Sequence, residues 1–376
     1  ENGFCQSKDL PYGIYTVRQT KGWEGRELID DFDVYIAKDS QTYRFLINNA
    51  NFESRLKIVK ADAETGKTIP YAGAGFQIYD PDGNLITQTF TYPEITEIDT
   101  FYTNSEGYLI TPEPLAYGFG YSLVEVQAPY GYVLNSEPLY FDVTQENSSE
   151  ESGITVIEVV KENTAQKGII KISKTGEVFA SVTESEGIYQ PVYEVQGLPG
   201  AAFEIIAAED VYTLDGTLRY SAGEIVDTIT TGADGTAQSK PLYLGKFKIR
   251  EAEFPSGTVD TGAEPQIVEL TYGGQEVEIT ETHAALYNQR QKVRVTLDKV
   301  LEQDKKFQIG MNDEVTAVTF GLFAGEDITA ADGTEIPKDG LIEILSLNET
   351  SSSECKTDIP FGHFYLKELS ADDHYI

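Results

Sequence analysis

The segment LAYGFGYSLVE, at residues 115–125, alternates aromatic or aliphatic residues with small or polar ones and ends in an acid. Such an alternation with period two is typical of a β-strand that buries one face. The block, a small turn followed by this strand and then an acid or an amide, occurs three more times. The other copies are LPYGIYTVRQ (residues 10–19), LYLGKFKIRE (242–251) and IPFGHFYLKE (359–368). Four copies in one chain predict a tandem array of β-domains.

Two further elements recur in a fixed order with this block. An apolar strand that ends in lysine occurs at residues 56–60, 170–174 and 293–299, and each copy is followed by a short segment with phenylalanine, at 74–76, 201–203 and 319–321. An asparagine closes the strand before each junction and lies 11 residues before the next lysine: Asn49 before Lys60, Asn163 before Lys174, and Asn288 before Lys299. This constant spacing predicts a junction of fixed length between repeats.

The repeats divide the chain into four predicted segments. Residues 54–165 and 166–290 are predicted to be two complete domains. Residues 1–53 are predicted to be the C-terminal part of a preceding repeat, and residues 291–376 the N-terminal part of a further one. Short alternating runs separated by turns such as Asp234-Gly235 indicate an all-β sandwich or barrel.

The composition argues against several classes of function. The 376 residues include 28 Lys and Arg against 62 Asp and Glu, a formal net charge of −34, and such a surface repels nucleic acid and anionic membranes. Because 40% of the residues are hydrophobic and 11% aromatic, packed cores are expected. No run approaches the roughly 18 apolar residues that span a bilayer. Two cysteines and three histidines predict neither a disulfide framework nor a metal site, and no cofactor is expected.

Strand parity places three types of polar residue in core-facing rows. Lys60 continues the apolar row of Leu56 and Ile58, whereas the row that leads to Asn163 is less regular because it contains Lys161. The other residues that continue an apolar row are Lys174, Lys299, Glu125, Glu251, Glu368 and Asn288. A buried amine loses its proton more readily, and a buried carboxyl keeps its own. An uncharged amine can therefore attack the side-chain carbon of asparagine while the acid shuttles protons, which yields an isopeptide bond and ammonia without turnover.

Together these elements resemble the Cna-B-type, or SpaA-like, repeats of Gram-positive surface adhesins and pilins. That family carries a lysine on its first strand, a Tyr-x-Leu-x-Glu segment followed by Ala-Pro-x-Gly-Tyr, and an asparagine on its last strand. Residues 121–132, YSLVEVQAPYGY, match the middle segment throughout. The resemblance implies a prealbumin-like, Ig-like Greek-key β-sandwich for each repeat. It also implies two cross-links, each promoted by an acid: Lys60 to Asn163 with Glu125, and Lys174 to Asn288 with Glu251.

The resemblance is incomplete in the two outer segments. Lys299 and Glu368 match the lysine and the acid of a further repeat, whose asparagine would lie beyond Ile376. Asn49 matches the cross-linking asparagine of the first segment, where Gln19 replaces the acid. Because glutamine cannot shuttle a proton, we expect this segment to lack the bond or to use another group.

The resemblance implies a structural stalk segment that lies outside the cell and is attached to the cell wall through other parts of its parent chain. An enzyme is not expected, because no convergent His, Cys or Ser constellation stands out. The alternative is a module that binds a host matrix protein or glycan through the insertions at residues 85–104 and 177–197, which lengthen loops. Residues 80–84 predict a hairpin turn rather than a calcium loop. Cys5 and Cys355 belong to different repeats, so we expect no bond between them.

Overall fold

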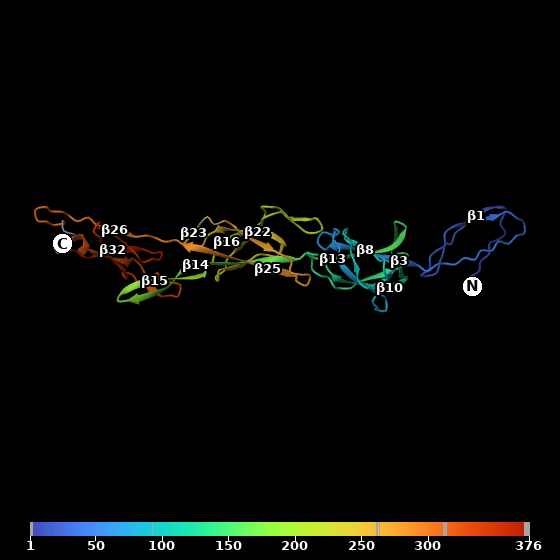
Figure 1. The fold of residues 1–376 in the computed structure, drawn as a ribbon, viewed down its shortest axis with the longest axis horizontal. Helices are drawn as coiled ribbons and strands as arrows, with labels where there is room; N and C mark the ends of the chain where they lie inside the picture. Colours follow the sequence, from blue (N-terminus) through green and yellow to red (C-terminus); the bar gives the residue numbers. More distant parts are fainter. Residues whose placement is uncertain (1–2, 92, 261, 263, 311–313, 372–376) are drawn as a thin grey trace. The chain divides into compact units, whose positions relative to one another are not determined.

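The computed structural model describes residues 3–91, 93–260, 262, 264–310 and 314–371, and nearly all of its regular elements are β-strands (Figure 1). The one short helix in this part of the chain is the 3-10 turn η1 (Glu314–Ala317). The all-β architecture predicted from the sequence is confirmed. The chain forms two compact units. The first comprises Glu1–Lys167, Tyr212–Arg219 and Tyr272–Thr280; the second comprises Gly168–Val211, Tyr220–Thr271 and Glu281–Ile376. The four segment boundaries inferred from the repeats stay a prediction.

The first unit contains a β-sandwich of two sheets. One sheet has the order β11 (Leu139–Val143), β10 (Gly118–Gln127), β4 (Gly75–Tyr79) and β7 (Phe101–Tyr102). The other has the order β12 (Ser148–Glu151), β13 (Ile154–Asn163), β3 (Glu53–Asp62) and β8 (Tyr108–Ile110), and β9 (Leu115–Ala116) also pairs with β3. The first and last long strands, β3 and β13, are neighbours and run parallel.

The core of this sandwich follows the predicted parity. Leu56 and Ile58 of β3 are fully buried, and they pack with Phe76 from β4 and Leu123 from β10 of the opposite sheet. Burial of apolar side chains from both sheets stabilises the sandwich by roughly 25 cal/mol per Å² of apolar surface removed from water. Alternate residues of β3 therefore face the core, and Lys60 continues their row.

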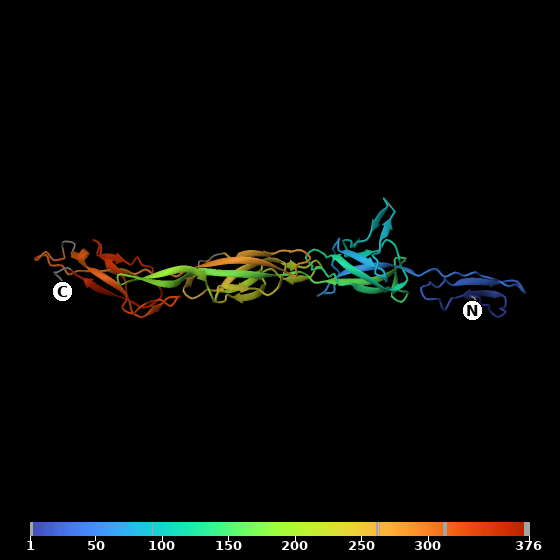
Figure 2. The same ribbon diagram turned by 90° about the horizontal axis from the view of Figure 1, so that it is seen from below.

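Two hairpins of the first unit lie outside these sheets. Strands β1 (Gly13–Val17) and β2 (Phe32–Ile36) form an antiparallel ribbon in the first segment. Strands β5 (Gln88–Phe90) and β6 (Thr96–Ile98) form a hairpin, which stands out from the first sandwich in cyan in Figure 2. The insertion at residues 85–104 is therefore partly strand, although the sequence suggested a lengthened loop. The Asp82-Gly83 turn precedes it, with the Asp80 carboxylate accepting bonds from the Asp82 and Asn84 amides.

The second unit repeats the sandwich and extends it. One sheet has the order β19 (Ile225–Thr230), β16 (Ala202–Ala207), β22 (Gly245–Glu253) and β24 (Gln266–Leu270). The larger sheet has the order β23 (Thr258–Val259), β25 (Ile279–Arg290), β14 (Lys167–Ser185), β15 (Ile188–Gly197), β30 (Leu341–Ser346), β27 (Thr319–Ala324) and β32 (Phe364–Ser370). Strands β20 (Thr236–Gln238) and β21 (Leu242–Tyr243) also pair with β14. The short pairs of this unit are β26 (Thr296–Asp298) with β31 (Ser352–Glu354), and β28 (Ile328–Thr329) with β29 (Glu335–Ile336). A further short pair, β17 (Val211–Tyr212) with β18 (Leu218–Tyr220), consists mostly of residues of the first unit.

Separate apolar cores lie within the second unit. The second sandwich is centred on Ile170, Phe203 and Phe247. A further core forms around Leu322 and Ile342, in the part of the chain that follows β25. The insertion at residues 177–197, for which a lengthened loop was expected, instead forms most of the long arms of β14 and β15. Because these arms form an antiparallel pair with each other, the segment is a strand hairpin rather than a loop.

Candidate cross-linking sites

The first candidate site spans the two sheets of the first sandwich. Lys60 lies on β3 and Asn163 ends the neighbouring strand β13, where the parallel register sets Asn163 opposite Asp62. The two side chains therefore emerge on the same face, two residues apart along the strands. Glu125 comes from β10 in the opposite sheet. The sandwich thus brings together three predicted residues that are widely separated in the sequence.

The three side chains are in direct contact. The Lys60 Nζ donates a hydrogen bond to Asn163 Oδ1 and lies 2.8 Å from Glu125 Oε1. The other carboxylate oxygen, Glu125 Oε2, accepts a hydrogen bond of 2.6 Å from Asn163 Nδ2. One carboxyl group therefore touches both the amine and the amide nitrogen of the same asparagine. Two backbone groups hold this arrangement, because the Val133 carbonyl accepts from Asn163 Nδ2 at 2.7 Å and the Asn135 amide donates to Glu125 Oε2 at 2.9 Å.

Burial sets the electrostatics of this site. The side chains of Lys60 and Glu125 are 0% exposed, and Asn163 is 1% exposed. Removal from water lowers the pKa of Lys60 to about 8, although the Glu125 carboxylate acts in the opposite direction. The Phe76 ring lies 5.5 Å from Lys60 Nζ and covers the amine on one side. An amine with this pKa is uncharged in about a tenth of the molecules at pH 7.

The second candidate site repeats the first one. Lys174 on β14 donates a hydrogen bond of 2.5 Å to Asn288 Oδ1 on β25, and its Nζ lies 2.7 Å from Glu251 Oε2 on β22. Glu251 Oε1 accepts a hydrogen bond of 2.8 Å from Asn288 Nδ2. Lys174 is buried, whereas the Glu251 side chain is 12% exposed. The acid again contacts the amine and the amide nitrogen through different oxygens.

A glycine supports each lysine through the backbone. The Gly107 carbonyl accepts from the Lys60 amide at 2.9 Å, and the Gly235 carbonyl accepts from the Lys174 amide at 2.8 Å. Both glycines have positive φ, and a Cβ on Gly107 would come within 2.1 Å of the Ile69 carbonyl oxygen. The backbone can pass this close to its neighbours because glycine has no side chain.

The third predicted pair forms in a more open setting. The Lys299 Nζ lies 2.8 Å from Glu368 Oε2, and the side chains are 28% and 37% exposed, respectively. The Phe320 ring lies 5.6 Å from the amine. Among the described residues, a lysine and an acid are in contact here, and no asparagine contacts either of them. A cross-link at Lys299 stays a prediction.

The first segment contains the amide half of such a site. Asn49 is buried, and its Nδ2 donates to Gln19 Oε1 at 2.7 Å and to the Glu27 carbonyl at 2.5 Å. Gln19 therefore lies beside Asn49 as Glu125 lies beside Asn163. In the part of the chain that the structure describes, the Asn49 side chain bonds to Gln19 and Glu27 and not to a lysine. A cross-link at Asn49 stays a prediction.

Several residues that shape these sites were not predicted from the sequence. Phe76, Phe203 and Phe320 pair in register with Glu125, Glu251 and Glu368, and each ring lies 5.5 to 5.6 Å from the local lysine amine. The repeated phenylalanine after each lysine was the available signal. Lys161, which made the Asn163 row irregular, is also buried, and its Nζ donates to the Glu137 carbonyl at 2.5 Å. Burial lowers the pKa of Lys161.

A buried acid lies two residues beyond the first lysine. Asp62 is fully buried, accepts a hydrogen bond of 3.0 Å from the Tyr132 hydroxyl, and pairs with Arg219 at 3.0 Å. Burial raises the pKa of Tyr132, and the Asp62 charge acts in the same direction. Tyr132 is the last residue of the APYGY segment, so this segment also anchors the end of β3.

The described residues contain no grouping of three His, Cys, Asp or Glu side chains placed to hold a metal ion. None of the helices described here has the length and apolar character needed to cross a bilayer. Cys5 and Cys355 are both free thiols.

Comparison with known proteins supports the fold. A family model described as "SpaA: Prealbumin-like fold domain" matches residues 54–158 and 192–283, more than half of the chain. The Bacillus anthracis TIE protein is similar in structure, with a TM-score of 0.51 and 20% sequence identity over 95% of this chain. This chain spans about half of that protein, which is covered to 53%.

Two further solved structures have lower similarity to this chain. The major pilin subunit BcpA of Bacillus cereus has a TM-score of 0.33 and 16% identity, with coverage of 85% of this chain and 89% of that chain. A streptococcal ancillary pilin has a TM-score of 0.24 and 18% identity, with coverage of 75% and 76%. No curated relative matches the chain.

Proposed function

The chain belongs to the SpaA prealbumin-like fold family, and from this premise we propose that it is a non-enzymatic stalk segment of a Gram-positive surface adhesin or pilin. Two of its sandwiches lock themselves by forming an internal Lys–Asn isopeptide bond. The chain acts outside the cell and is attached to the cell wall through other parts of its parent.

One observation carries the proposal. A buried lysine, an acid and an asparagine are in mutual contact in the first sandwich, and the same triplet recurs in the second sandwich. Burying such groups is unfavourable unless each one satisfies the others. Repetition of this costly arrangement, with the same atoms in contact, supports a chemical role rather than a role in packing.

The contacts suggest how the bond would form at the first site. The uncharged Lys60 Nζ attacks Cγ of Asn163 and forms the new C–N bond. Glu125 takes a proton from the amine at Oε1 and supplies one to Nδ2, with which its other oxygen is in contact. The bond between Cγ and Nδ2 then breaks, and ammonia leaves. The acid ends with the number of protons it had at the start, so no cofactor or oxidant is needed.

The consequence is mechanical. The bonds would join the first and last strands of each sandwich across sequence separations of 103 and 114 residues. A force that enters by the first strand and leaves by the last would pass through a covalent bond, so the sheets between them would bear little load. Such a domain resists both shear and proteolysis without disulfide bonds.

Intact mass spectrometry of the denatured chain tests the proposal. Each bond removes one ammonia, so the mass should lie about 34 Da below the value for the sequence. Glu251→Gln should restore about 17 Da, after correction for the substitution itself. Glu368→Gln serves as the matched control, because no asparagine completes that pair in the described residues, and it should leave the deficit unchanged. A wild-type mass equal to the sequence value would refute the cross-links.

A second candidate function rests on the β5–β6 hairpin of the first unit. It exposes Phe90 and Ile95, with 42% and 80% of their surfaces accessible. We propose contact with a host matrix protein or glycan as the role of these side chains. The proposal would be supported if the full chain binds a glycan array or immobilised matrix proteins and the Ile95→Ser variant does not. Equal binding by the wild-type and variant chains would exclude the hairpin as the binding surface.

A further inference from the structure

The long hairpin of residues 175–197, which comprises the distal arms of β14 and β15, has no counterpart in the first sandwich. There β3 ends at Asp62 and β4 begins at Gly75, and a short connection joins them. In the second sandwich β14 continues past Lys174 to Ser185, and β15 returns to Gly197. Glu186 and Gly187 at the tip both have positive φ, as a tight two-residue turn between twisted strands requires.

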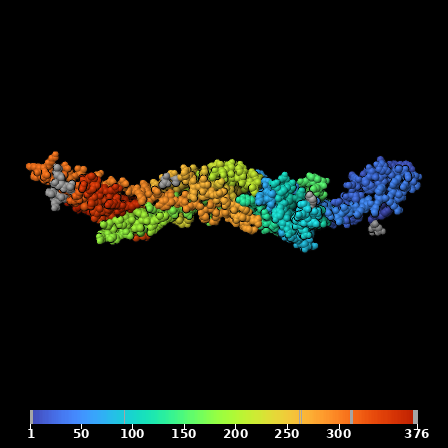
Figure 3. Space-filling view, in the orientation of Figure 1, coloured from blue at the N-terminus to red at the C-terminus, as the bar shows by residue number. Residues whose placement is uncertain are grey.

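One face of this hairpin is covered by the following part of the same chain. Phe179, Val182 and Tyr189 pack against the core around Leu322 and Ile342. Figure 3 shows the yellow-green atoms of the hairpin against the red atoms of the C-terminal segment. The contact is therefore apolar at its centre, like the core of a protein interface.

Hydrogen bonds fix the register of the contact. A β-bulge between Phe179 and Ser181 interrupts the pairing of β14 with β15. The carbonyls of Phe179 and Ala180 accept bonds of 3.0 and 3.1 Å from the amides of Ala331 and Asp332. The bulge thus turns two carbonyls away from the hairpin and towards the neighbouring segment.

Three further contacts extend the docked face. The Val182 amide donates to Thr334 Oγ1 at 2.8 Å, and Gln190 Nε2 donates to the Ile342 carbonyl at 3.0 Å. Ile188 pairs with Leu341, which joins β15 to β30 in one sheet. The hairpin therefore continues the sheet of the second sandwich into the next segment.

One arginine contacts both the base of the hairpin and the following segment. Arg290 ends β25, and its guanidinium lies 3.8 Å above the Tyr193 ring of the hairpin. The same group pairs with Asp358 of the following segment, and Lys292 Nζ also lies 3.1 Å from that carboxylate. Arg290 is nearly buried, so loss of either contact would leave a charge poorly compensated.

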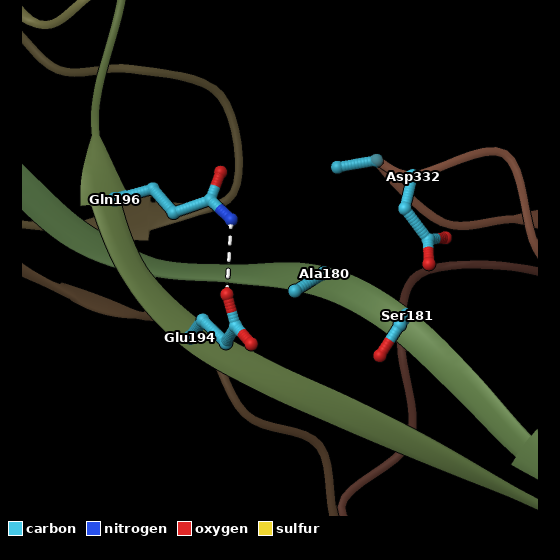
Figure 4. A pocket seen from close by; sticks show the side chains of 6 residues that line it. Ala180, Ser181, Glu194, Gln196 and Asp332 are labelled. Carbon is cyan, nitrogen blue, oxygen red and sulfur yellow. Dashed lines mark hydrogen bonds between the residues drawn. The ribbon is translucent and has the colours of Figure 1, made fainter.

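The open side of the contact is polar. A surface pocket lies between the hairpin and the loop that carries Ala331 and Asp332, with Ser181, Glu194 and Gln196 on the hairpin side (Figure 4). Gln196 Nε2 donates to Glu194 Oε2 across 3.4 Å. The pocket lies at the polar edge of the contact.

We propose that the hairpin of residues 175–197 is an intramolecular docking arm whose partner is the next β-segment of the same chain, residues 314–371, which it holds folded. The arm adds sheet pairing, apolar cover and the Tyr193 ring that packs on Arg290, next to a segment whose own lysine and acid are partly exposed. It stabilises that segment without covalent chemistry, so the inference does not depend on the proposed cross-links.

Hydrogen exchange measured by mass spectrometry on the full chain tests the arm. In the double variant F179A/V182A, amides of β27 and β30 should exchange about tenfold faster or more, because the segment opens locally without its cover. Amides of β16 and β22 should keep their wild-type rates. Val195→Ala, on the same hairpin but 61% exposed, is the matched control and should change nothing.

A variant in the segment that the hairpin contacts provides a second test, which does not depend on whether the F179A/V182A hairpin folds. Thr334→Val removes the acceptor for the Val182 amide and should accelerate exchange in β30 in the same direction, by a smaller factor. Exchange rates in β27 and β30 equal to those of the control would overturn the proposal. Equal acceleration of β16 and β22 would also overturn it, because the hairpin would then belong to the core of the second sandwich alone.

Discussion

Replacing Glu125 with glutamine removes the proton carrier that we assign to the first site and preserves the size of the side chain. A glutamine oxygen can still accept the hydrogen bond from Asn163 Nδ2. The chain should therefore fold, with Lys60 beside Asn163 but without a bond between them. The change removes the cross-link and also the carboxylate that faces Lys60 Nζ, so the loss of stability is at least that of the cross-link.

The magnitude follows from the length of the closed loop. Lys60 and Asn163 are 103 residues apart, and on the loop-entropy model a link across about 100 residues stabilises by about 4.7 kcal/mol. For a domain of roughly 110 residues, a loss of this size lowers Tm by about 15–25 °C.

Scanning calorimetry and intact mass provide the assay. The Glu125→Gln chain should retain one ammonia, about 17 Da, and its first sandwich should unfold about 15–25 °C lower, while the second sandwich keeps its transition as an internal reference. Glu106→Gln changes an exposed acid of the same sandwich and should move neither quantity. If the mass shows a lost bond while Tm stays at the wild-type value, the loop-entropy reasoning is wrong.

Three further predictions concern the surroundings of the same site. Burial lowers the pKa of Lys60 to about 8, and only the deprotonated amine attacks. The rate of bond formation during refolding from denaturant, followed by mass against time, should therefore rise about tenfold from pH 6 to 7 and level off above about pH 8. A rate that does not change with pH would contradict this. Tyr132→Phe removes the hydroxyl that donates to a buried carboxylate and should cost about 1–2 kcal/mol in denaturant unfolding, whereas Tyr130→Phe at an exposed ring should cost nothing measurable. Gly107→Ala would push a Cβ against a backbone carbonyl and should lower the free energy of unfolding by about 3 kcal/mol or more. Gly120→Ala, at a position with positive φ and open space, should lower it by about 1 kcal/mol. Equal losses would show that the close approach of Gly107 to the carbonyl does not matter.

Residues on a strand alternate between faces, so parity in the sequence was enough to place Lys60, Lys174 and Glu125 in core-facing rows, and the structure buries all three. Parity was less informative for Asn163, because Lys161 precedes it in the same row. Lys161 is buried as well, since its long side chain carries the amine to the Glu137 carbonyl. A periodic pattern reports the face of a strand and does not report where a flexible side chain ends.

The structure of the two insertions could not be predicted from local sequence patterns. Residues 177–197 and 85–104 stood out only by their length and aromatic content, which suggested loops that bind a ligand. The first of them forms strands whose apolar face is covered by residues far along the chain. A local sequence pattern does not indicate which distant segment will cover an exposed face, because that depends on packing between residues far apart in the chain.

The sequence by itself determined the repeated β-architecture, the order of lysine, acid and asparagine in each repeat, and the face on which most of them lie, because all of these follow from local alternation and from spacing along one chain. Only the tertiary structure decided that β3 and β13 run side by side in parallel and that β10 approaches from the opposite sheet. Contact among Lys60, Glu125 and Asn163 depends on that pairing, which is set by burial of a shared core between residues distant in sequence. Docking of the hairpin likewise depends on tertiary structure, because its apolar face is covered by residues distant in the sequence.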